Sequence, residues 1–479
     1  MATNGFASTN PQTHVVIVPL MAQGHLIPAM DIATLLASRG VLVTVVTTPV
    51  NSARFLSAHL PFRLAELPFP ASSVGLPDGC ENLDLLHSED HFVLFFQATA
   101  LLRDPLASLL RQCRPLPTCL ISDMCHPWTK DVASDLKIPR LIFHGTSCFA
   151  LLCYHATRTH GLLKNPEPFV IPEIPHRIVA TSNEVAFWFA GQRWEELNTK
   201  TLESEEAADG FVLNSFDFLE GASIAKYIES VNKKVFCIGP LCLSSKDLAA
   251  HVGRGGQASV DEQKCVDWLN GKKPRSVIYV SFGSLTYLFP NQLIEIGMGL
   301  EASGVPFILV IKNTEASPPV RRWLSEEGFE ERNKETGMVI KGWAPQALIL
   351  SHPAVGGYVT HCGWNSVLEG VSAGLPAIAW PHFADQLLNK RLVVDVLGIG
   401  VDVGVRKEQG IMAGKPVEAV GREEVEKAVR ELMDGGEEGE ERRRKAKELG
   451  EAARKALDDG GSSYKDLTEL LRFISHCDG

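Results

Sequence analysis

The stretch from Val359 to Gly370, VTHCGWNSVLEG, places a polar turn where an apolar strand gives way to a helix. The helix begins at GWNS, because the apolar residues that follow recur at helical spacing. Free backbone N–H groups at such a start attract an anion, and Asn365 and Ser366 add donors beside His361. Glu369 follows one turn later, where its carboxylate can accept hydrogen bonds from a ribose diol. The pattern predicts a site for a diphosphate and a ribose. The alternative is that Asn365 or Ser366 only caps the helix and that Glu369 is a solvated acid.

Two neighbouring segments carry side chains suited to a base and a sugar. Trp343 follows the strand MVIK in GWAPQ, and its indole suits stacking on a uracil ring. Asp385 and Gln386 follow the strand AIAW in WPHFADQ, and a carboxylate beside an amide suits the vicinal hydroxyls of a sugar. Ligands of open parallel sheets bind at the carboxyl ends of the strands, so we expect these side chains at one edge.

A candidate catalytic pair lies near the N-terminus. His25 ends the loop MAQGH between the first strand and the first helix, where the positive helix end disfavours protonation of the imidazole. Asp123 ends the strand TCLISD at the same edge, where a carboxylate orients the ring and stabilises the imidazolium. The pair predicts a general base, and the alternative is a structural His in a turn.

Two sheets are needed to position these residues. Strands and helices alternate from HVVIVPL to IPRLIFHG, and again from SVIYVSFGS to GIGVDVG, with a polar, Gly-rich segment between the two series. Such alternation predicts parallel sheets covered on both faces. We therefore expect an α/β protein with two doubly wound Rossmann-like domains that face each other across a cleft. The predicted boundaries are residues 1–245 for the first domain, 246–262 for a linker, 263–460 for the second domain and 461–479 for a C-terminal helix that packs back on the first domain.

Composition narrows the class of protein. The 479 residues are 45% hydrophobic, and Lys+Arg 46 against Asp+Glu 57 give a net charge of −11, which argues against nucleic acid and anionic membranes as partners. The N-terminus lacks the basic and apolar regions of a signal peptide, and the longest apolar runs are about half of the ~20 residues that span a bilayer. The 11 Cys form no CxxC pair, which favours reduced thiols. We expect a cytoplasmic monomer without membrane insertion.

The segment from Trp343 to Gln386, WAPQALILSHPAVGGYVTHCGWNSVLEGVSAGLPAIAWPHFADQ, resembles the signature box of plant family 1 UDP-dependent glycosyltransferases, which have the GT-B fold. The resemblance extends over nearly the whole chain, including GHLIPAMDIATLLASRG, SDMCHPWTKDVA, SVIYVSFGS and GGSSYKDLTELLRF. It implies that residues 1–245 bind the acceptor and that residues 263–460 bind the UDP-sugar.

The resemblance also implies roles for single residues. Trp343 would stack on uracil while the backbone of Ala344 pairs with its edge, and Gln346 and Glu369 would hold the ribose. The implied diphosphate ligands are Ser284, His361, Asn365 and Ser366, and the implied sugar contacts are Trp364, Asp385 and Gln386. No role is assigned to His382, because the family varies at this position.

By the same resemblance, His25 and Asp123 form a His-Asp dyad. His25 would take the proton of an acceptor hydroxyl that attacks the anomeric carbon, so an α-linked donor would give a β-glycoside. Gln386 at the end of the box implies UDP-glucose as the donor. No two Asp residues are separated by one residue, so the Asp-x-Asp pair common in metal-using sugar-nucleotide enzymes is missing, and we expect no metal or other cofactor.

Aromatic clusters in the first half are the candidates for a hydrophobic acceptor pocket, although most aromatics at helical spacing belong to a core. These residues are Phe92, Phe96, Phe149, Trp188 and Phe189. The resemblance favours a flavonoid or other phenolic acceptor first and a triterpenoid or steroid second.

Two other functions are considered. GVSAG matches the nucleophile elbow of serine hydrolases at Ser372, but a helix precedes this Ser and a strand follows it, which is the reverse of that motif. GIMAGK at 410–415 is one residue short of a P-loop and lacks the Ser/Thr. A non-catalytic binder of nucleotide sugars would keep the box without the dyad, and both dyad residues are present.

Overall fold

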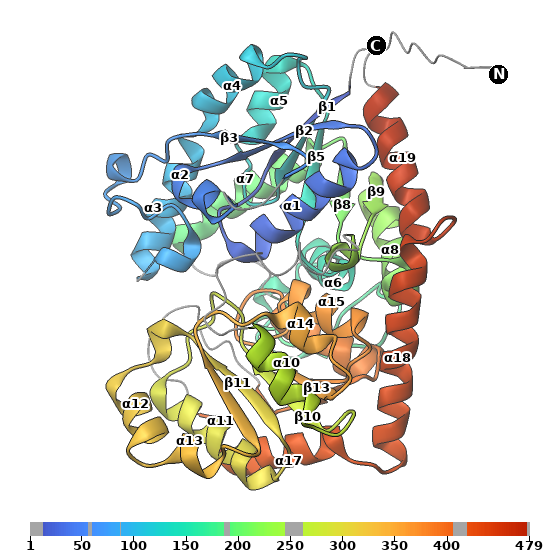
Figure 1. Ribbon diagram of the computed structural model, residues 1–479. Coiled ribbons are helices and arrows are strands. Elements are labelled where there is room, and N and C mark those ends of the chain that lie inside the picture. Colours follow the sequence, from blue (N-terminus) through green and yellow to red (C-terminus); the bar gives the residue numbers. More distant parts are fainter. Residues whose placement is uncertain are drawn as a thin grey trace, which may run out of the picture.

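The computed structural model describes residues 13–55, 60–86, 88–185, 192–244, 262–405 and 419–476, and it places them in two α/β domains, one above the other in Figure 1. Each domain is built on one parallel sheet, as the alternation of strands and helices predicts. Residues 246–261 of the predicted linker, 246–262, lie outside the described residues, and helix α10 begins at Glu262, the last residue of that linker.

The first sheet has seven parallel strands in the order β3-β2-β1-β4-β5-β8-β9. Its central strands are short runs rich in Val, Ile and Leu that are buried throughout, because helices cover both faces. The strands are β1 (His14–Val18), β2 (Leu42–Thr47), β3 (Arg63–Glu66), β4 (Cys119–Asp123), β5 (Arg140–His144), β8 (Gly210–Leu213) and β9 (Lys234–Cys237). The helices of this half are α1 (Gln23–Ala37), α2 (Pro49–Ser52), α3 (Glu89–Ala100), α4 (Arg103–Gln112), α5 (Thr129–Leu136), α6 (Cys148–Thr159), α7 (Glu195–Glu206) and α8 (Asp217–Val231). A small antiparallel pair, β6 (Phe169–Val170) and β7 (Val179–Ala180), lies outside the sheet.

The second sheet has six parallel strands in the order β12-β11-β10-β13-β14-β15. The strands are β10 (Val277–Ser281), β11 (Phe307–Ile311), β12 (Gly337–Lys341), β13 (Val355–Thr360), β14 (Ala377–Ala379) and β15 (Gly400–Asp402). The helices are α10 (Glu262–Asn270), α11 (Pro290–Ser303), α12 (Pro318–Ser325), α13 (Phe329–Arg332), α14 (Gln346–Leu350), α15 (Trp364–Ser372), α16 (Gln386–Arg391) and α17 (Arg422–Met433).

The chain returns to the first domain at its C-terminal end. Helix α18 (Glu437–Leu457) contacts α15 of the second domain and α8 of the first, and α19 (Ser462–His476) packs beside β9. Leu467, Leu470 and Ile474 of α19 are buried in the core of the first domain. The backbone N–H of Cys237 in β9 donates to the carboxylate of Asp466, with N and Oδ2 2.8 Å apart.

One stretch of the described residues, Asp90–Gln112, is long and apolar enough to cross a membrane by length and composition. The stretch is divided between α3 and α4 and is partly buried inside the structure. Core helices of soluble proteins pass the same test, so the stretch is weak evidence for a membrane span. The count of uninterrupted apolar runs missed it because polar residues are interspersed along α3 and α4.

Candidate active site

A cavity of about 480 Å³ lies where the carboxyl edges of the two sheets meet. His25 and Gly145 line it from the first domain. Every residue predicted to bind the donor lines it from the second domain, namely Ser284, Trp343, Ala344, Gln346, His361, Trp364, Asn365, Ser366, Glu369, Asp385 and Gln386. The structure therefore brings together residues that the sequence patterns and the family resemblance singled out, from segments up to 361 positions apart.

His25 and Asp123 form a hydrogen-bonded pair at the edge of the first sheet. Strands β1 and β4 are neighbours with Val18 opposite Ser122, so the chain leaves β1 level with the end of β4. Nδ1 of His25 lies 2.7 Å from Oδ2 of Asp123, whose other oxygen accepts from the N–H of Cys125 at 2.9 Å. The His25 side chain is 26% exposed and that of Asp123 only 1%, so the carboxylate is buried behind a ring that faces the cavity.

Two sequence-based expectations about His25 are wrong. Helix α1 begins at Gln23 after an extended Ala22 and ends at Ala37, so His25 lies inside the first turn and does not end the loop. The pKa of His25 is also raised above its ordinary value of 6.5. Burial lowers this pKa, but the charge and hydrogen bond of Asp123, with a further contribution from Asp385, outweigh the burial.

The pKa of Asp123 moves the other way. Burial raises the pKa of its carboxyl group, but the charge and hydrogen bond of His25 outweigh this effect and bring the pKa down to about 2. Asp123 is therefore ionised at neutral pH, and its hydrogen bond fixes a neutral His25 with the proton on Nδ1. The Nε2 atom is then left to accept a proton from a substrate.

The start of α15 is open to an anion. Cys362 has a left-handed backbone, with φ of 63°, which turns the chain from β13 into the helix. Gly363 is the N-cap residue, and no side chain caps the helix. Asn365 and Ser366 lie inside the first turn, so the alternative reading in which one of them merely caps the helix is wrong. Gly363, Trp364, Asn365 and Ser366 line the cavity, so the helix N-terminus, where free N–H groups favour an anion, borders it.

His361 is a neutral donor beside this helix start. Its ring packs against Gly283 and Gly363, and a Cβ built on Gly283 would lie 2.5 Å from the ring. Burial, with a smaller contribution from the positive charge of Lys312, lowers the pKa of His361 to about 3. The ring therefore contributes an N–H to a ligand rather than a positive charge.

Lys312 is a cavity residue that the sequence analysis missed. Among the described residues it is the one Lys or Arg that lines the cavity. Its Nζ lies 3.4 Å from the carbonyl oxygen of Ser284 and 3.3 Å from Oε1 of Glu315. It directly follows β11, so the rule that ligands bind at the carboxyl ends of strands would have found it.

The residues predicted for the base and the ribose are neighbours. Gln346 donates from Nε2 to Oε2 of Glu369 at 2.5 Å, and the hydroxyl of Tyr279 lies 3.3 Å from Oε1 of Gln346. Trp343 is partly exposed at the same edge, and Ala344 is buried beside it. The carboxylate of Glu369 and the amide of Gln346 lie side by side, so together they could bind the two hydroxyls of a ribose diol.

Asp385 and Gln386 line the cavity, yet both side chains also bind protein. Oδ2 of Asp385 accepts from the hydroxyl of Thr146 in the first domain at 2.5 Å and from Nδ2 of Asn389 at 2.8 Å. Burial raises the pKa of Asp385. Oε1 of Gln386 accepts from the backbone N–H groups of His382 and Phe383 at 2.8 and 3.1 Å. Their contact with a sugar stays a prediction.

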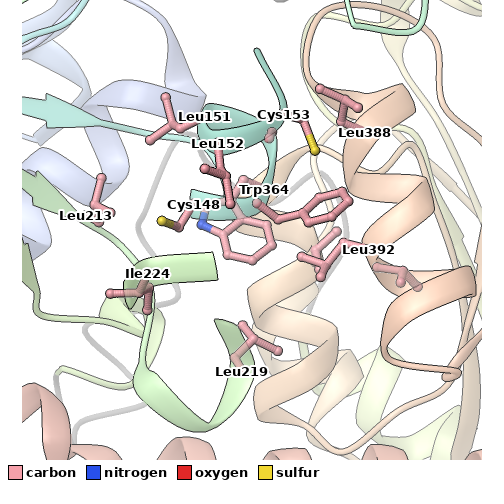
Figure 2. Packing of buried hydrophobic residues seen from close by; sticks show 14 of the residues in the cluster. Cys148, Leu151, Leu152, Cys153, Leu213, Leu219, Ile224, Trp364, Leu388 and Leu392 are labelled. Carbon is pink, nitrogen blue, oxygen red and sulfur yellow. The ribbon is translucent and has the colours of Figure 1, made fainter. Parts of the chain in front are cut away.

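Trp364 joins the two domains. Its indole is 2% exposed, and Figure 2 shows it packed between α6, which carries Cys148 and Leu152, and the segment with Leu388 and Leu392. Its Nε1 donates to the carbonyl oxygen of Asn214 in the first domain at 2.7 Å. The predicted sugar contact of this residue also stays a prediction.

The aromatic residues proposed for the acceptor pocket are placed elsewhere. Phe92 and Phe96 are buried in a core of the first domain, and Phe149 is buried in the apolar cluster that contains Trp364. None of the three is among the lining residues of the cavity. Trp188 and Phe189 lie outside the described residues, as does GIMAGK. The assignment of these aromatic residues to an acceptor pocket therefore gains no support from the cavity.

Ser372 is the last residue of α15 and is 5% exposed, with its Oγ 3.4 Å from Sγ of Cys242. A nucleophile elbow needs a preceding strand, so this Ser is not a hydrolase nucleophile. Within the described ranges, no group of three or more His, Cys, Asp or Glu side chains is arranged to hold a metal ion.

Comparison with known proteins identifies the family. A model described as UDP-glucoronosyl and UDP-glucosyl transferase matches residues 249–429, and one described as glycosyltransferase, N-terminal domain, matches residues 11–243. UDP-glycosyltransferase 73C6 of Arabidopsis thaliana is 44% identical over 478 residues, which is 96% of each chain.

Solved structures agree. UGT73P12 of Glycyrrhiza uralensis, complexed with glycyrrhetinic acid 3-O-monoglucuronide, superposes with a TM-score of 0.88 at 36% identity over 97% of this chain and 96% of its own. UGT2 of Phytolacca americana, complexed with UDP-2fluoro-glucose and pterostilbene, gives 0.77 at 27% identity over 97% and 100%. With two Rossmann-like domains, a cavity lined by the signature box and relatives along its full length, the chain belongs to the plant family 1 UDP-glycosyltransferases of GT-B fold.

Proposed function

We propose that this enzyme transfers glucose from UDP-glucose to a hydroxyl of a hydrophobic small molecule, with inversion at the anomeric carbon and without a metal ion. The observation that carries the proposal is the His25–Asp123 pair, which lies across the cavity from the open start of α15. A flavonoid or other phenolic is the first choice of acceptor, and a triterpenoid or steroid is the second.

The reaction is a single displacement. Nε2 of His25 takes the proton of the acceptor hydroxyl, and the oxygen attacks the anomeric carbon on the face opposite the diphosphate. The bond between the anomeric carbon and the diphosphate oxygen breaks, its electron pair stays on UDP, and the α-linked donor gives a β-glycoside. Asp123 stabilises the imidazolium that forms. The N–H groups of α15, together with His361, Asn365 and Ser366, stabilise the charge that develops on the leaving diphosphate.

In the part of the chain that the structure describes, three acidic side chains line the cavity, and each already has a protein partner. Asp84 pairs with Arg54, Glu369 with Gln346 and Asp385 with Thr146. This pairing supports a reaction without a metal, in which the helix start, the neutral donors and the ammonium group of Lys312 take the place of a metal ion.

The donor assignment depends on Asp385 and Gln386. The relative complexed with UDP-2fluoro-glucose supports a glucose donor. A relative complexed with UDP-L-rhamnose, UGT89C1 of Arabidopsis thaliana, has the same fold, so the fold alone does not select the sugar. A monomeric state and a cytoplasmic location are further parts of the proposal.

One assay tests the proposed donor, acceptor, inversion, metal independence and base together. The wild-type enzyme receives UDP-glucose, UDP-galactose, UDP-xylose or UDP-glucuronate with a panel of flavonoids, sapogenins and steroids, and UDP release and product anomer are measured with and without EDTA. We expect β-glucosides from UDP-glucose, unaffected by EDTA, and a loss of about 10²- to 10⁴-fold in His25→Ala, with UDP affinity retained. Preference for another donor, an α-product, loss of activity with EDTA or near wild-type turnover of His25→Ala would each refute the corresponding part.

A further inference from the structure

A hydrogen bond links the helix start of one domain to the catalytic helix of the other. Nδ2 of Asn365, in the first turn of α15, donates to the backbone carbonyl oxygen of Gly24 at 2.6 Å. Gly24 lies in the first turn of α1 and is bonded to His25. The amide therefore reaches from the predicted diphosphate site to the backbone next to the base.

The sequence explains why this carbonyl accepts a bond from outside its helix. In an α-helix the carbonyl of Gly24 would accept from the N–H four residues later, and that residue is Pro28, which has no N–H. The proline ring also crowds the carbonyl four residues earlier and tilts it away from the helix axis. Gly24 thus offers an oxygen that α1 itself does not satisfy, and Asn365 supplies the donor.

The orientation of the Asn365 amide follows from the same contact. A carbonyl oxygen can only accept, so the nitrogen of the amide must face Gly24. The other atom, Oδ1, is buried and has no partner among the described residues. The bond to Gly24 is therefore what fixes the side chain across the cleft.

We propose that Asn365 is a positioning residue for His25. It holds the first turn of α1, and with it the imidazole, at a fixed place relative to the diphosphate bound at the start of α15. Proximity of the base to the acceptor hydroxyl and the anomeric carbon then depends on one amide that belongs to the donor site. This inference rests on the proposed role of His25 as the base, and it adds an interdomain role to the diphosphate contact that family resemblance implies for Asn365.

A double-mutant cycle between Asn365→Ala and Pro28→Ala tests the proposal. Alanine at position 28 restores the missing N–H, so the Gly24 carbonyl no longer needs Asn365. In the wild-type background we expect Asn365→Ala to lower kcat about tenfold, and in the Pro28→Ala background only about twofold. UDP affinity, measured by calorimetry, should fall by the same factor in both backgrounds, because the diphosphate contact is lost in each.

Ser366→Ala is the matched control, since Ser366 is the next residue of the same turn and a predicted diphosphate ligand. Its effect on kcat should be equal in the two backgrounds. Pro28→Ser restores the same N–H and replaces Pro28→Ala where the latter does not fold. Equal losses of kcat for Asn365→Ala in both backgrounds would overturn the proposal and leave Asn365 as a diphosphate ligand only.

The failure of this inference is distinguishable from that of the proposed function. Midpoints of thermal unfolding without any ligand measure the Asn365–Gly24 bond independently of catalysis. Non-additive midpoints for the same cycle support the bond even if His25→Ala keeps its turnover, a result that would refute the base. Additive midpoints together with additive kcat values refute the positioning role while leaving the base intact.

Discussion

Two opposing effects act on the imidazole of His25, and their balance determines when it is a base. Burial lowers the pKa of His25, and Asp123 raises it by more than burial lowers it. The pKa therefore lies above 6.5. Only the neutral ring accepts a proton, so activity is present above this pKa and is lost as the pH falls through it.

We therefore expect kcat/KM for the acceptor to rise with pH through a transition above pH 6.5. In Asp123→Asn the larger raising effect is lost, while burial and the smaller contribution of Asp385 remain, so the transition should move to lower pH while the maximum falls. The measurement is a pH profile of both enzymes with one acceptor at saturating UDP-glucose. A transition that does not move in Asp123→Asn would mean that another group titrates.

The position beside the ring of His361 requires a glycine, Gly283. Gly283 has φ of +70°, and a Cβ there would lie 2.5 Å from the His361 ring. Gly283→Ala should displace the ring and weaken UDP binding about ten- to a hundredfold, because overpacking costs about 1–3 kcal/mol. Gly304→Ala is the control, since Gly304 has nearly the same φ, +68°, but nothing within 4 Å of its added Cβ. Equal UDP affinities of the two variants, read by calorimetry, would exclude steric positioning of His361.

At the scale of elements, the ribose site is assembled from two helices. Gln346 begins α14 and Glu369 lies in α15, and their side chains meet at 2.5 Å. The site can therefore recognise a diol only while both helices keep their places at the sheet edge.

This arrangement predicts that Glu369→Ala weakens the preference of the enzyme for a nucleotide with an intact ribose diol. The wild-type enzyme should bind UDP about tenfold more tightly than 2′,3′-dideoxyuridine diphosphate, because hydrogen bonds to a charged group contribute about 1.5–3 kcal/mol. Glu369→Ala should lose most of this preference while its affinity for the dideoxy compound changes little. An unchanged preference in competition assays would place the ribose elsewhere.

The strands and helices could be predicted from the sequence, whereas the ends of helices and the contacts between the domains could not. Alternating apolar runs specify a parallel sheet, so both sheets and the edge that carries His361 and Asp385 were predictable. The start of α1 was placed too late, because Gln23 and Gly24 have no strong helix signal and no side chain caps the helix. The partners of Asp385 and Trp364 lie in the other domain, at Thr146 and Asn214, and no local pattern encodes such distant pairs.

At the scale of the whole molecule, the indole of Trp364 contributes to holding the domains together. Its Nε1 donates across the interface to Asn214, and the ring fills the apolar cluster between α6 and α16. Trp364, a residue of the signature box, therefore links the geometry of the donor site to the packing of the two domains against each other.

Trp364→Phe should lower the midpoint of thermal unfolding and raise KM for the acceptor. The change leaves the carbonyl of Asn214 unpaired, at a cost of about 1–3 kcal/mol, and loosens the contact between the domains. Trp323→Phe is the control, because Trp323 is equally buried within the second domain and its Nε1 has no partner among the described residues. If Trp323→Phe raised KM for the acceptor as much as Trp364→Phe, the interface would not be the cause.

The packing of α19 on the first domain has a consequence for folding during synthesis on the ribosome. The last strand of the first sheet ends at Cys237, while the helix that covers it starts only at Ser462, 225 residues later. At about 5–20 residues per second, the ribosome needs about 10–45 s to synthesise that interval. During this time the first sheet lacks the contacts of Leu467, Leu470 and Ile474. The nascent first domain therefore exposes apolar surface that chaperones can bind. A stop codon a few residues before Ser462 would leave both sheets and the whole cavity encoded, yet would produce a chain whose first domain never acquires its cover.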